Sequence, residues 1–233
     1  MRTATWTDSI SVLDRVTAVL EAFGDDDSLG VSEIARRANL PKSTVSRIAT
    51  DLVRRRYLDR DGARLHLGLS LFELGQAVER PRMLRRLALP VMTELRNITG
   101  ESISLGVLDG DHIILIASLA GRDGTGLTVA SRMLAHSTAL GTAILAHSRE
   151  SGAAPLPASH AWVEVRRTGV ASEEPGSTGT TSVASPILSR GSAPVGAIAV
   201  SGPPATVDRR RVGGLVRAAA AELGRQLSLI ATP

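Results

Sequence analysis

A stripe of apolar residues at helical spacing predicts a helix that begins at Pro41 and includes Arg54. Its members, at i, i+3, i+4, i+7 and i+8, are Val45, Ile48, Ala49, Leu52 and Val53. Pro41 stands where a helix favours proline, at its first position, and so puts Lys42 and Ser43 in the first turn. A shorter stripe predicts a preceding helix that ends near Ala38 and has Ser32 as its N-cap. Two helices joined by a tight turn are therefore expected.

Downstream of these helices the spacing changes to that of short strands. Leu65 and Leu67 alternate with His66, as in a half-buried strand, and residues 60–64, Arg-Asp-Gly-Ala-Arg, carry a turn signal. Two helices followed by a β-hairpin, in this order, predict a winged helix-turn-helix, a fold that reads DNA.

The polar face of the second helix and the hairpin, or wing, carry side chains suited to DNA. Hydroxyl and guanidinium groups hydrogen-bond to base edges and phosphates, and basic residues at a wing tip contact phosphates or a minor groove. A run such as residues 54–56, Arg-Arg-Arg, is usually a solvated helix face when it occurs alone, but here charge, spacing and turn chemistry coincide. The candidate DNA-binding residues are Lys42, Ser43, Thr44, Ser46, Arg47, Thr50, Arg54, Arg60 and Arg64.

The rest of the chain predicts a linker and a second domain. We expect the DNA-binding domain over residues 1–68, a linker helix over 69–81, and a second domain over 82–233. Pro81 marks the boundary, because proline disfavours helical geometry in the residue before it. The second domain is expected to begin with a helix from about Arg82 to Ile98.

The second domain combines strands and helices. Apolar residues alternate with small or polar ones over 102–107, and an apolar run follows at 113–116, so these segments predict paired strands. A second hairpin is expected over 183–188 and 195–200, and a last amphipathic helix over 207–230. The chain is thus predicted to be a mixed α/β protein with two domains, of which the second is α+β.

Composition narrows the class of protein. The 233 residues are 43% hydrophobic, which suits two modest cores. The chain has no cysteine, and its five histidines are scattered, so we expect no disulfide, no metal site and no cofactor. No signal-peptide pattern and no membrane-spanning stretch is found, so a cytoplasmic location is expected. The net charge of +4 is too small to identify a partner by itself.

Seven segments in order resemble the IclR family, the isocitrate-lyase-regulator type of bacterial transcription factor. The resemblance covers nearly the whole chain, and it implies a winged helix-turn-helix followed by a GAF-like effector-binding domain. The segments are SVLDRVTAVLEAF (11–23), LPKSTVSRIATDLVRRRYL (40–58), RLHLGLSLFELG (64–75), TGESISLGVLDGDHIILIASL (99–119), HSTALGTAILA (136–146), GTTSVASPI (179–187) and VGAIAVSGP (195–203).

The resemblance also implies a pocket for a small effector between the sheet and the helix that begins near Ala139. The chain departs from the family pattern there: Ser182 replaces a frequent cysteine, Ala199 replaces a serine, and Ser172 stands at an acidic position. The segment 148–169 is short, as if a helix were missing. We therefore expect a small, partly apolar metabolite. The candidate contacts are Leu105, Ala139, Leu140, Gly141, Ser182 and Ser201.

The expected function is that of a repressor, and the expected partners are the effector and double-stranded DNA. A homodimer or homotetramer would bind a pseudo-palindromic operator, because two-fold protein symmetry implies two-fold DNA symmetry. Two alternatives differ in the second domain. In the first alternative, the second domain is a scaffold for oligomerisation that binds no ligand. In the second, it is a hydrolase that uses Ser201, or Ser137 with His136. No Gly-x-Ser-x-Gly, His-Glu-x-x-His or phosphate-binding glycine motif supports the hydrolase.

Overall fold

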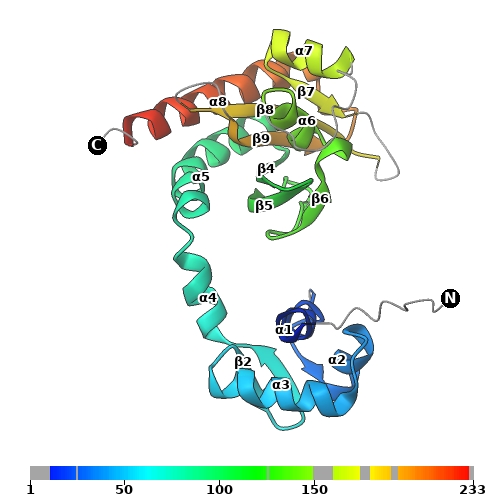
Figure 1. Ribbon diagram of the computed structural model, residues 1–233. Helices are drawn as coiled ribbons and strands as arrows, with labels where there is room; N and C mark the ends of the chain where they lie inside the picture. Colours follow the sequence, from blue (N-terminus) through cyan, green and yellow to red (C-terminus); the bar gives the residue numbers. More distant parts are fainter. Residues whose placement is uncertain are drawn as a thin grey trace, which may run out of the picture. The chain divides into compact units, whose positions relative to one another are not determined.

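The fold consists of two units, residues 1–79 and 80–233 (Figure 1). The computed structural model describes residues 11–24, 26–124, 126–148, 160–173, 179–189 and 194–230. The helix that we expected as a linker groups with the first unit. Each unit has its own hydrophobic core, so each is described separately.

The first unit has the element order of a winged helix-turn-helix. A capping box begins its first helix, because the Asp14 amide donates to the Ser11 hydroxyl over 3.0 Å and the Ser11 amide donates to the Asp14 carboxylate over 2.9 Å. Asn39, in the left-handed region at φ 51°, makes the tight turn between the second and third helices. The elements are α1 (Val12–Glu21), β1 (Leu29–Gly30), α2 (Val31–Arg37), α3 (Lys42–Arg54), β2 (Leu58–Asp61), β3 (Arg64–Leu67) and α4 (Leu69–Gln76).

The core of this unit confirms the apolar stripe predicted for α3. Val45, Ala49 and Leu52 are buried, and they pack with Ile34 of α2 and Phe23, which follows α1. The hydrophobic contact of α2 with α3 holds the two helices of the motif at a fixed angle. The polar face of α3 is left to solvent.

Three local predictions in this unit need correction. Ser32 is not the N-cap of α2: β1 runs directly into the helix, which begins at Val31 with Gly30 as its cap. Pro41 is the N-cap of α3 rather than its first residue. Leu65 is fully buried as expected, but Leu67 is 45% exposed, because only the first of these leucines reaches the core under the three-stranded sheet.

The wing is the antiparallel hairpin of β2 and β3, with Gly62 in the left-handed region at its turn. Arg60 pairs with Leu65 and Asp61 with Arg64, so the two wing arginines lie on opposite faces of the hairpin. The guanidinium group of Arg64 is hydrogen-bonded to Ser28. Its Nε donates to the Ser28 hydroxyl over 2.7 Å, and its Nη2 donates to the Ser28 carbonyl over 2.6 Å.

The second unit is built on one antiparallel sheet of six strands in the order β6-β5-β4-β9-β8-β7. The structure confirms both predicted hairpins and the last helix. The strands are β4 (Ser102–Asp109), β5 (His112–Leu119), β6 (Arg132–Leu134), β7 (Ala171–Glu173), β8 (Thr181–Leu188) and β9 (Pro194–Gly202), and the helices are α5 (Glu79–Thr99), the 3-10 turn η1 (Ala135–Ser137), α6 (Ala139–Leu145), α7 (His160–Thr168) and α8 (Arg209–Ile230).

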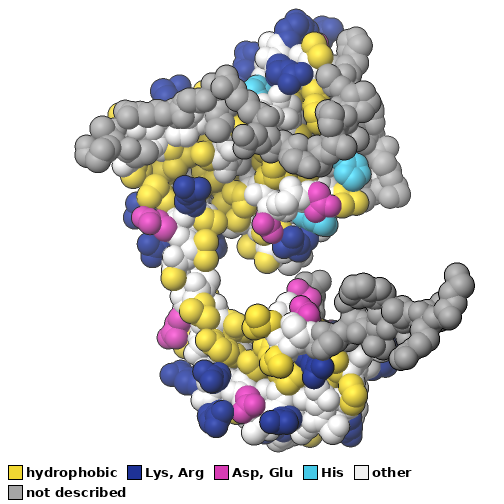
Figure 2. Space-filling view, in the orientation of Figure 1, with side chains coloured by type: hydrophobic (Ala, Val, Ile, Leu, Met, Phe, Trp, Pro, Cys, Tyr) yellow, Lys and Arg dark blue, Asp and Glu magenta, His cyan; other side chains and the backbone are white. Residues whose placement is uncertain are grey.

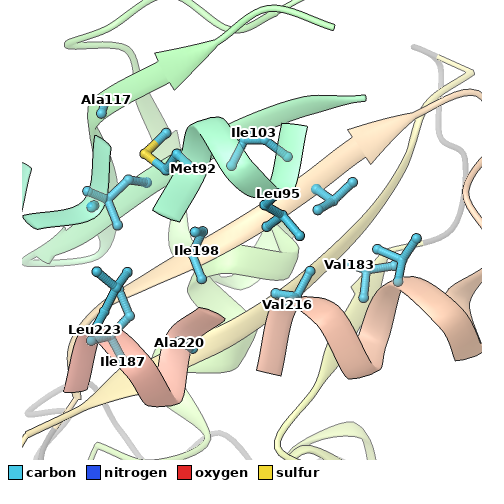
Figure 3. Close-up of a cluster of buried hydrophobic side chains, with 14 of the residues drawn as sticks. Met92, Leu95, Ile103, Ala117, Val183, Ile187, Ile198, Val216, Ala220 and Leu223 are labelled. Carbon is cyan, nitrogen blue, oxygen red and sulfur yellow. The ribbon is translucent and has the colours of Figure 1, made fainter. Parts of the chain in front are cut away.

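Each face of the sheet has its own apolar cluster. On one face, Met92 and Leu95 of α5 and Val216 and Leu223 of α8 pack on strand residues such as Ile198 (Figure 3). On the other face, α6 packs on small residues of β8 and β9, among them Ala184, Ala197 and Ala199, and α7 packs against α6 and β7. The small strand residues let α6 approach the sheet closely.

Two predictions about helices in this unit are wrong. The first helix of this unit does not begin at Arg82, because α5 begins at Glu79 and Pro81 lies in its first turn, where proline removes no helical hydrogen bond. The segment 148–169 does not lack a helix, since α7 occupies residues 160–168. Residues 149–159 lie outside the described part of the chain.

Two helical glycines predict opposite effects of alanine. A Cβ at Gly141 in α6 would lie 1.9 Å from the Ala135 carbonyl oxygen, whereas a Cβ at Gly214 in α8 meets nothing within 4 Å. We expect Gly141→Ala to lower the free energy of unfolding by about 1–3 kcal/mol or more, because the Ala135 backbone has to move. Gly214→Ala should raise it by about 0.5–1 kcal/mol through helix propensity. Urea unfolding checks both values, and equal effects would contradict the packing described for α6.

The hydrogen bonds of Arg64 predict a structural role for this residue. Arg64→Ala removes both contacts with Ser28, so we expect a loss of about 1 kcal/mol in the free energy of unfolding. Amide hydrogen exchange in β1 should become faster, because β1 pairs with β3 beside this contact. Arg60→Ala, on the opposite face of the hairpin, is the matched control and should change neither quantity. Equal exchange rates in the two variants would show that Ser28 does not hold the wing.

Candidate nucleic-acid interface and ligand pocket

The exposed face of α3 gathers most of the candidate DNA-binding residues. At about 100° per residue, Ser43, Arg47, Thr50 and Arg54 fall within one sector opposite the buried stripe. Figure 2 shows Lys and Arg side chains over this part of the first unit. All of the candidates on the helix except Thr44, which is half-buried, are exposed: Lys42, Ser43, Ser46, Arg47, Thr50 and Arg54.

The candidate side chains on this face differ in how far they are engaged. Thr50 donates its hydroxyl to the Ser46 carbonyl over 2.9 Å, and Arg54 forms an ion pair with Asp51 over 2.9 Å. Arg47 has no hydrogen bond or ion pair with any other described residue. An exposed guanidinium group with its donors free is able to bind a base edge or a phosphate without first breaking a protein contact.

An ion-pair cluster holds α2 beside α1. Glu33 accepts hydrogen bonds from Arg36 and Arg37, which lower the pKa of the Glu33 carboxyl to about 2. Arg37 also contacts the Asp26 carboxylate over 2.5 Å and the Ala22 carbonyl over 3.1 Å. The pKa of Glu33 is lower in the folded protein than its ordinary value of 4.5. The ionised Glu33 carboxylate therefore stabilises the fold above pH 4.5, and this stabilisation is lost as the pH falls toward 2.

An apolar groove lies between α1, α3 and α4. Its volume is about 740 Å³, and both Thr44 and Arg47 line it, so Arg47 borders the groove as well as the polar sector of α3. The groove continues into exposed hydrophobic side chains on α1 and α4 (Figure 2). These side chains, with their exposed fractions, are Val12 (72%), Leu13 (76%), Leu69 (54%), Phe72 (62%) and Leu74 (56%).

A second cavity, of about 290 Å³, lies in the second unit beside the start of α6. Four of the predicted effector contacts line it: Ala139, Leu140, Ser182 and Ser201. The full set of lining residues is Ser102, Ser104, Gly126, Leu127, Met133, Thr138, Ala139, Leu140, Glu173, Thr180, Ser182, Ala199 and Ser201. We call this cavity the ligand pocket.

Two predicted contacts do not line the ligand pocket. Leu105 points to the opposite face of the sheet and belongs to the core under α5 and α8, so strand alternation gives the pocket position to Ser104. Gly141 packs against the Ala135 backbone, which leaves no space for a ligand.

Nine of the thirteen lining residues were not predicted, and two of them carried a signal. Ser102 and Ser104 alternate with apolar residues in β4, and a polar residue at every second position of a buried strand indicates a polar cavity. Glu173 was missed because the acidic position was assigned to Ser172, one residue earlier. Ser172 is exposed, and only Glu173 has the parity in β7 that faces the pocket.

Hydrogen bonds order the polar side of the pocket. The hydroxyls of Ser182 and Ser201 lie 2.8 Å apart, and Ser102 donates to the Ser201 carbonyl over 2.7 Å. The Ala139 amide donates to the Glu173 carboxylate over 3.1 Å. No histidine is among the described residues that line the pocket.

The alternative nucleophile, Ser137, is also engaged. Its hydroxyl donates to the Leu134 carbonyl over 2.9 Å.

Among the residues that the structure describes, no His, Asp, Glu or Cys cluster could hold a metal ion. In the same part of the chain no helix has the length and apolar character needed to cross a bilayer. The described lining of the pocket combines hydroxyls and one carboxylate with an otherwise apolar wall.

Comparison with known proteins assigns both units to one family. Residues 12–62 match the IclR helix-turn-helix domain, and residues 76–162 match the C-terminal domain of the bacterial transcriptional regulator IclR. The regulator BhcR of Paracoccus denitrificans is 30% identical over 60% of this chain and 52% of its own length. The chain therefore spans about half the length of this relative. The glycerol operon regulatory protein of Streptomyces coelicolor is 29% identical over 83% of this chain and 85% of its own length.

Solved structures agree along the whole chain. An IclR homolog from Microbacterium hydrocarbonoxydans, solved in complex with 4-hydroxybenzoate, superposes with a TM-score of 0.82 at 27% identity and covers 94% of this chain and 100% of its own. The Thermotoga maritima IclR superposes with a TM-score of 0.72 at 21% identity, with 93% and 98% covered, which shows the shared fold. The winged helix-turn-helix and the α/β unit thus match the same proteins in the same order, and the chain belongs to the IclR family of bacterial transcriptional regulators.

Proposed function

We propose that this protein is a sequence-specific DNA-binding regulator, a repressor rather than an enzyme, whose affinity for its operator changes when a small metabolite binds the ligand pocket. The exposed face of α3 carries the proposal. Ser43, Arg47 and Thr50 share one solvent-facing sector of a helix that is fixed on its other side by the core. A rigid helix with exposed hydroxyl and guanidinium groups on one face is the geometry that enters a major groove.

The roles of the remaining candidate residues follow from where each side chain lies and from its contacts within the protein. Lys42 and Ser46 lie at the edge of this sector and Arg54 lies within it, paired with Asp51, and all three are suited to phosphates, which orient a protein on the duplex. Arg60 lies exposed on the wing and is suited to a phosphate or the minor groove. Arg64 positions the wing through Ser28, and Thr44 belongs to the groove beside α1.

Each predicted domain has one role in this proposal. Residues 1–68 bind DNA, residues 82–233 bind the effector, and residues 69–81 link effector binding to the DNA-binding domain. Ala139, Leu140, Ser182 and Ser201 line a cavity large enough for a small metabolite. The related protein from Microbacterium hydrocarbonoxydans was solved with 4-hydroxybenzoate, so a small ligand in this family has a solved precedent. A cavity with ordered hydroxyls favours this function over that of a scaffold without a ligand.

A homodimer is the assembly that the first unit supports. Large apolar side chains on α1 and α4, such as Leu13 and Phe72, are more than half exposed in the single chain. A contiguous apolar surface of this kind marks an interaction site. A second copy that covers it by two-fold symmetry would present two α3 helices to successive major grooves of a pseudo-palindrome, about one helical turn apart.

Substitution of Arg47 tests the orientation of α3 on DNA. The assay is fluorescence anisotropy with DNA from upstream of the protein's own gene, against a scrambled duplex at the same near-physiological salt concentration. Arg47→Ala should weaken specific binding by about 1–3 kcal/mol, the value of a bidentate contact to guanine. Its binding to scrambled DNA should change far less.

Arg60→Ala is the matched control for a phosphate contact. It should weaken binding to both duplexes alike and lower the slope of log affinity against log salt by about 1. An Arg47→Ala protein that binds its operator like the wild type would place another face of α3 on the bases. Equal binding of the wild type to both duplexes would contradict a regulator of its own gene.

A charge on the apolar surface tests the homodimer. Phe72→Asp should shift sedimentation of the full chain toward the monomer and weaken operator binding by about tenfold or more, because an unpaired carboxylate would be buried at the interface. Val163→Asp on α7, a residue also about half exposed at 52%, is the matched control. A Phe72→Asp protein with unchanged mass and unchanged operator affinity would exclude this face as the dimer interface.

A further inference from the structure

A groove in the second unit gathers arginine side chains from two helices. It lies between the C-terminal ends of α6 and α7, the outer part of β8 and the second half of α8, and its volume is about 810 Å³. Its lining includes Arg166 of α7 together with Arg217 and Arg225 of α8. We call it the arginine groove. The described linings of this groove and of the ligand pocket have no residue in common.

The arginine groove follows a part of the β8 edge that β7 does not cover. The pairing of β7 with β8 ends at Ala184, and β8 continues to Leu188. Addition of another strand here is disfavoured, because Pro186 has no N–H group to donate. The helix α8 also packs closely on the end of β8, where a Cβ at Gly224 would lie 2.2 Å from the Leu188 carbonyl oxygen. This edge therefore offers side chains to a ligand rather than a backbone ladder.

Two of the arginines meet at the end of α7. Arg166 lies in the last turn of α7, and its Nη1 donates to the carbonyl of Ala146, the C-cap of α6, over 3.1 Å. Arg217 reaches across from α8, and its Nη1 donates to the carbonyl of Thr168, the last residue of α7, over 3.2 Å. Both bonds satisfy carbonyl groups at helix ends and hold the guanidinium groups in place.

The two held guanidinium groups are suited to an acid group. A guanidinium has five N–H donors, and one carbonyl engages only part of this fork. Phosphate and carboxylate groups match the fork with two parallel hydrogen bonds. Because the side chains of Arg166 and Arg217 are already ordered, less conformational entropy is lost when an anion binds. Arg225, about two turns further along α8, pairs with Glu222 and adds less to this end of the groove.

The other end of the groove is apolar. Leu188 and Leu229 line it, and they are 37% and 76% exposed. Positions 217, 221, 225 and 229 are four residues apart, so they follow one face of α8 from the cationic end to the apolar end. The groove thus matches a molecule that is negatively charged at one end and apolar at the other.

We propose that the arginine groove is a second ligand site, for an organic anion with a phosphate or carboxylate group at one end and an apolar chain at the other. Arg166 and Arg217 bind the acid group, and Leu188 and Leu229 contact the chain. The ligand pocket borders the first residue of α6, Ala139, whereas the arginine groove borders the C-terminal end of the same helix. The two ligand sites therefore lie at opposite ends of α6.

The test compares probes that share a chain or an acid group. Octyl phosphate, octanoate, 1-octanol and inorganic phosphate are titrated into the full chain without DNA, and binding is measured by calorimetry at near-physiological salt concentration. Octyl phosphate should bind about tenfold or more tightly than 1-octanol, which lacks the acid group, and than inorganic phosphate, which lacks the chain. Octanoate should also bind more tightly than 1-octanol.

Substitutions assign the binding to the groove. Arg166→Gln and Arg217→Gln should each weaken binding of octyl phosphate by about tenfold. Arg217→Lys keeps the charge and a donor for the Thr168 carbonyl, so it should lose less affinity than Arg217→Gln. Arg167→Gln is the matched control, because Arg167 is next to Arg166 on α7 but pairs with Glu164 and does not line the groove. Thermal unfolding checks that each variant is folded.

The apolar end is tested separately. Leu229→Ser should weaken octyl phosphate by about threefold or more and leave inorganic phosphate unchanged.

Four results would overturn the proposal: no binding of octyl phosphate, equal binding of 1-octanol, equal losses in Arg166→Gln and Arg167→Gln, or unchanged affinity in the variants of Arg166 and Arg217. If these two variants instead weaken only duplex binding in the anisotropy assay, the arginines contact DNA and the groove is not a ligand site.

Discussion

The period of two along the strands of the second unit decides what each face of its sheet can do. In β9, Ile198 and Val200 point toward α5 and α8 and complete an apolar core, while Ala199 and Ser201 point toward α6. The same alternation in β4 puts Ile103 in the core and the adjacent serines in the pocket. The face toward α5 and α8 is therefore filled by large apolar side chains that stabilise the fold. The face toward α6 carries small side chains and hydroxyls, which leave space for a cavity.

A helical period has the same consequence in the first unit. Val45, Ala49 and Leu52 fix α3 on its buried side, which leaves a rigid polar face. Basic residues on this surface are not equivalent, however. Arg54 pairs with Asp51, and Arg64 is bound to Ser28, whereas Arg47 is free of such partners among the described residues. Residue type thus indicates a DNA-binding surface, but the contacts within the protein decide which arginines are available to DNA.

The sequence predicted periodic features well and one-residue details poorly. The helices α3 and α8 follow from an apolar stripe, and both hairpins of the second unit follow from alternation or from short apolar runs. The pocket depends on parity, and an error of one residue moves a side chain to the other face. This is why Leu105 was predicted where Ser104 lies, and why Glu173 was overlooked in favour of Ser172. The predictions of the N-cap of α2 and of the first residue of α5 were also wrong. Local propensity does not specify the tertiary contacts that set helix ends.

A regulator also needs a physical connection from the pocket to the helix that leads back to the first unit. The pocket lies on the α6 face of the sheet, whereas α5 packs on the opposite face. β4 reaches both, because Ser102 and Ser104 line the pocket while Ile103 packs in one core with Leu95 of α5. A ligand can shift DNA binding only if it binds two states with different affinity. That difference can reach α5 through β4 or through β9, because Ser201 lines the pocket while Val200 of the same strand packs in one core with Leu95 of α5.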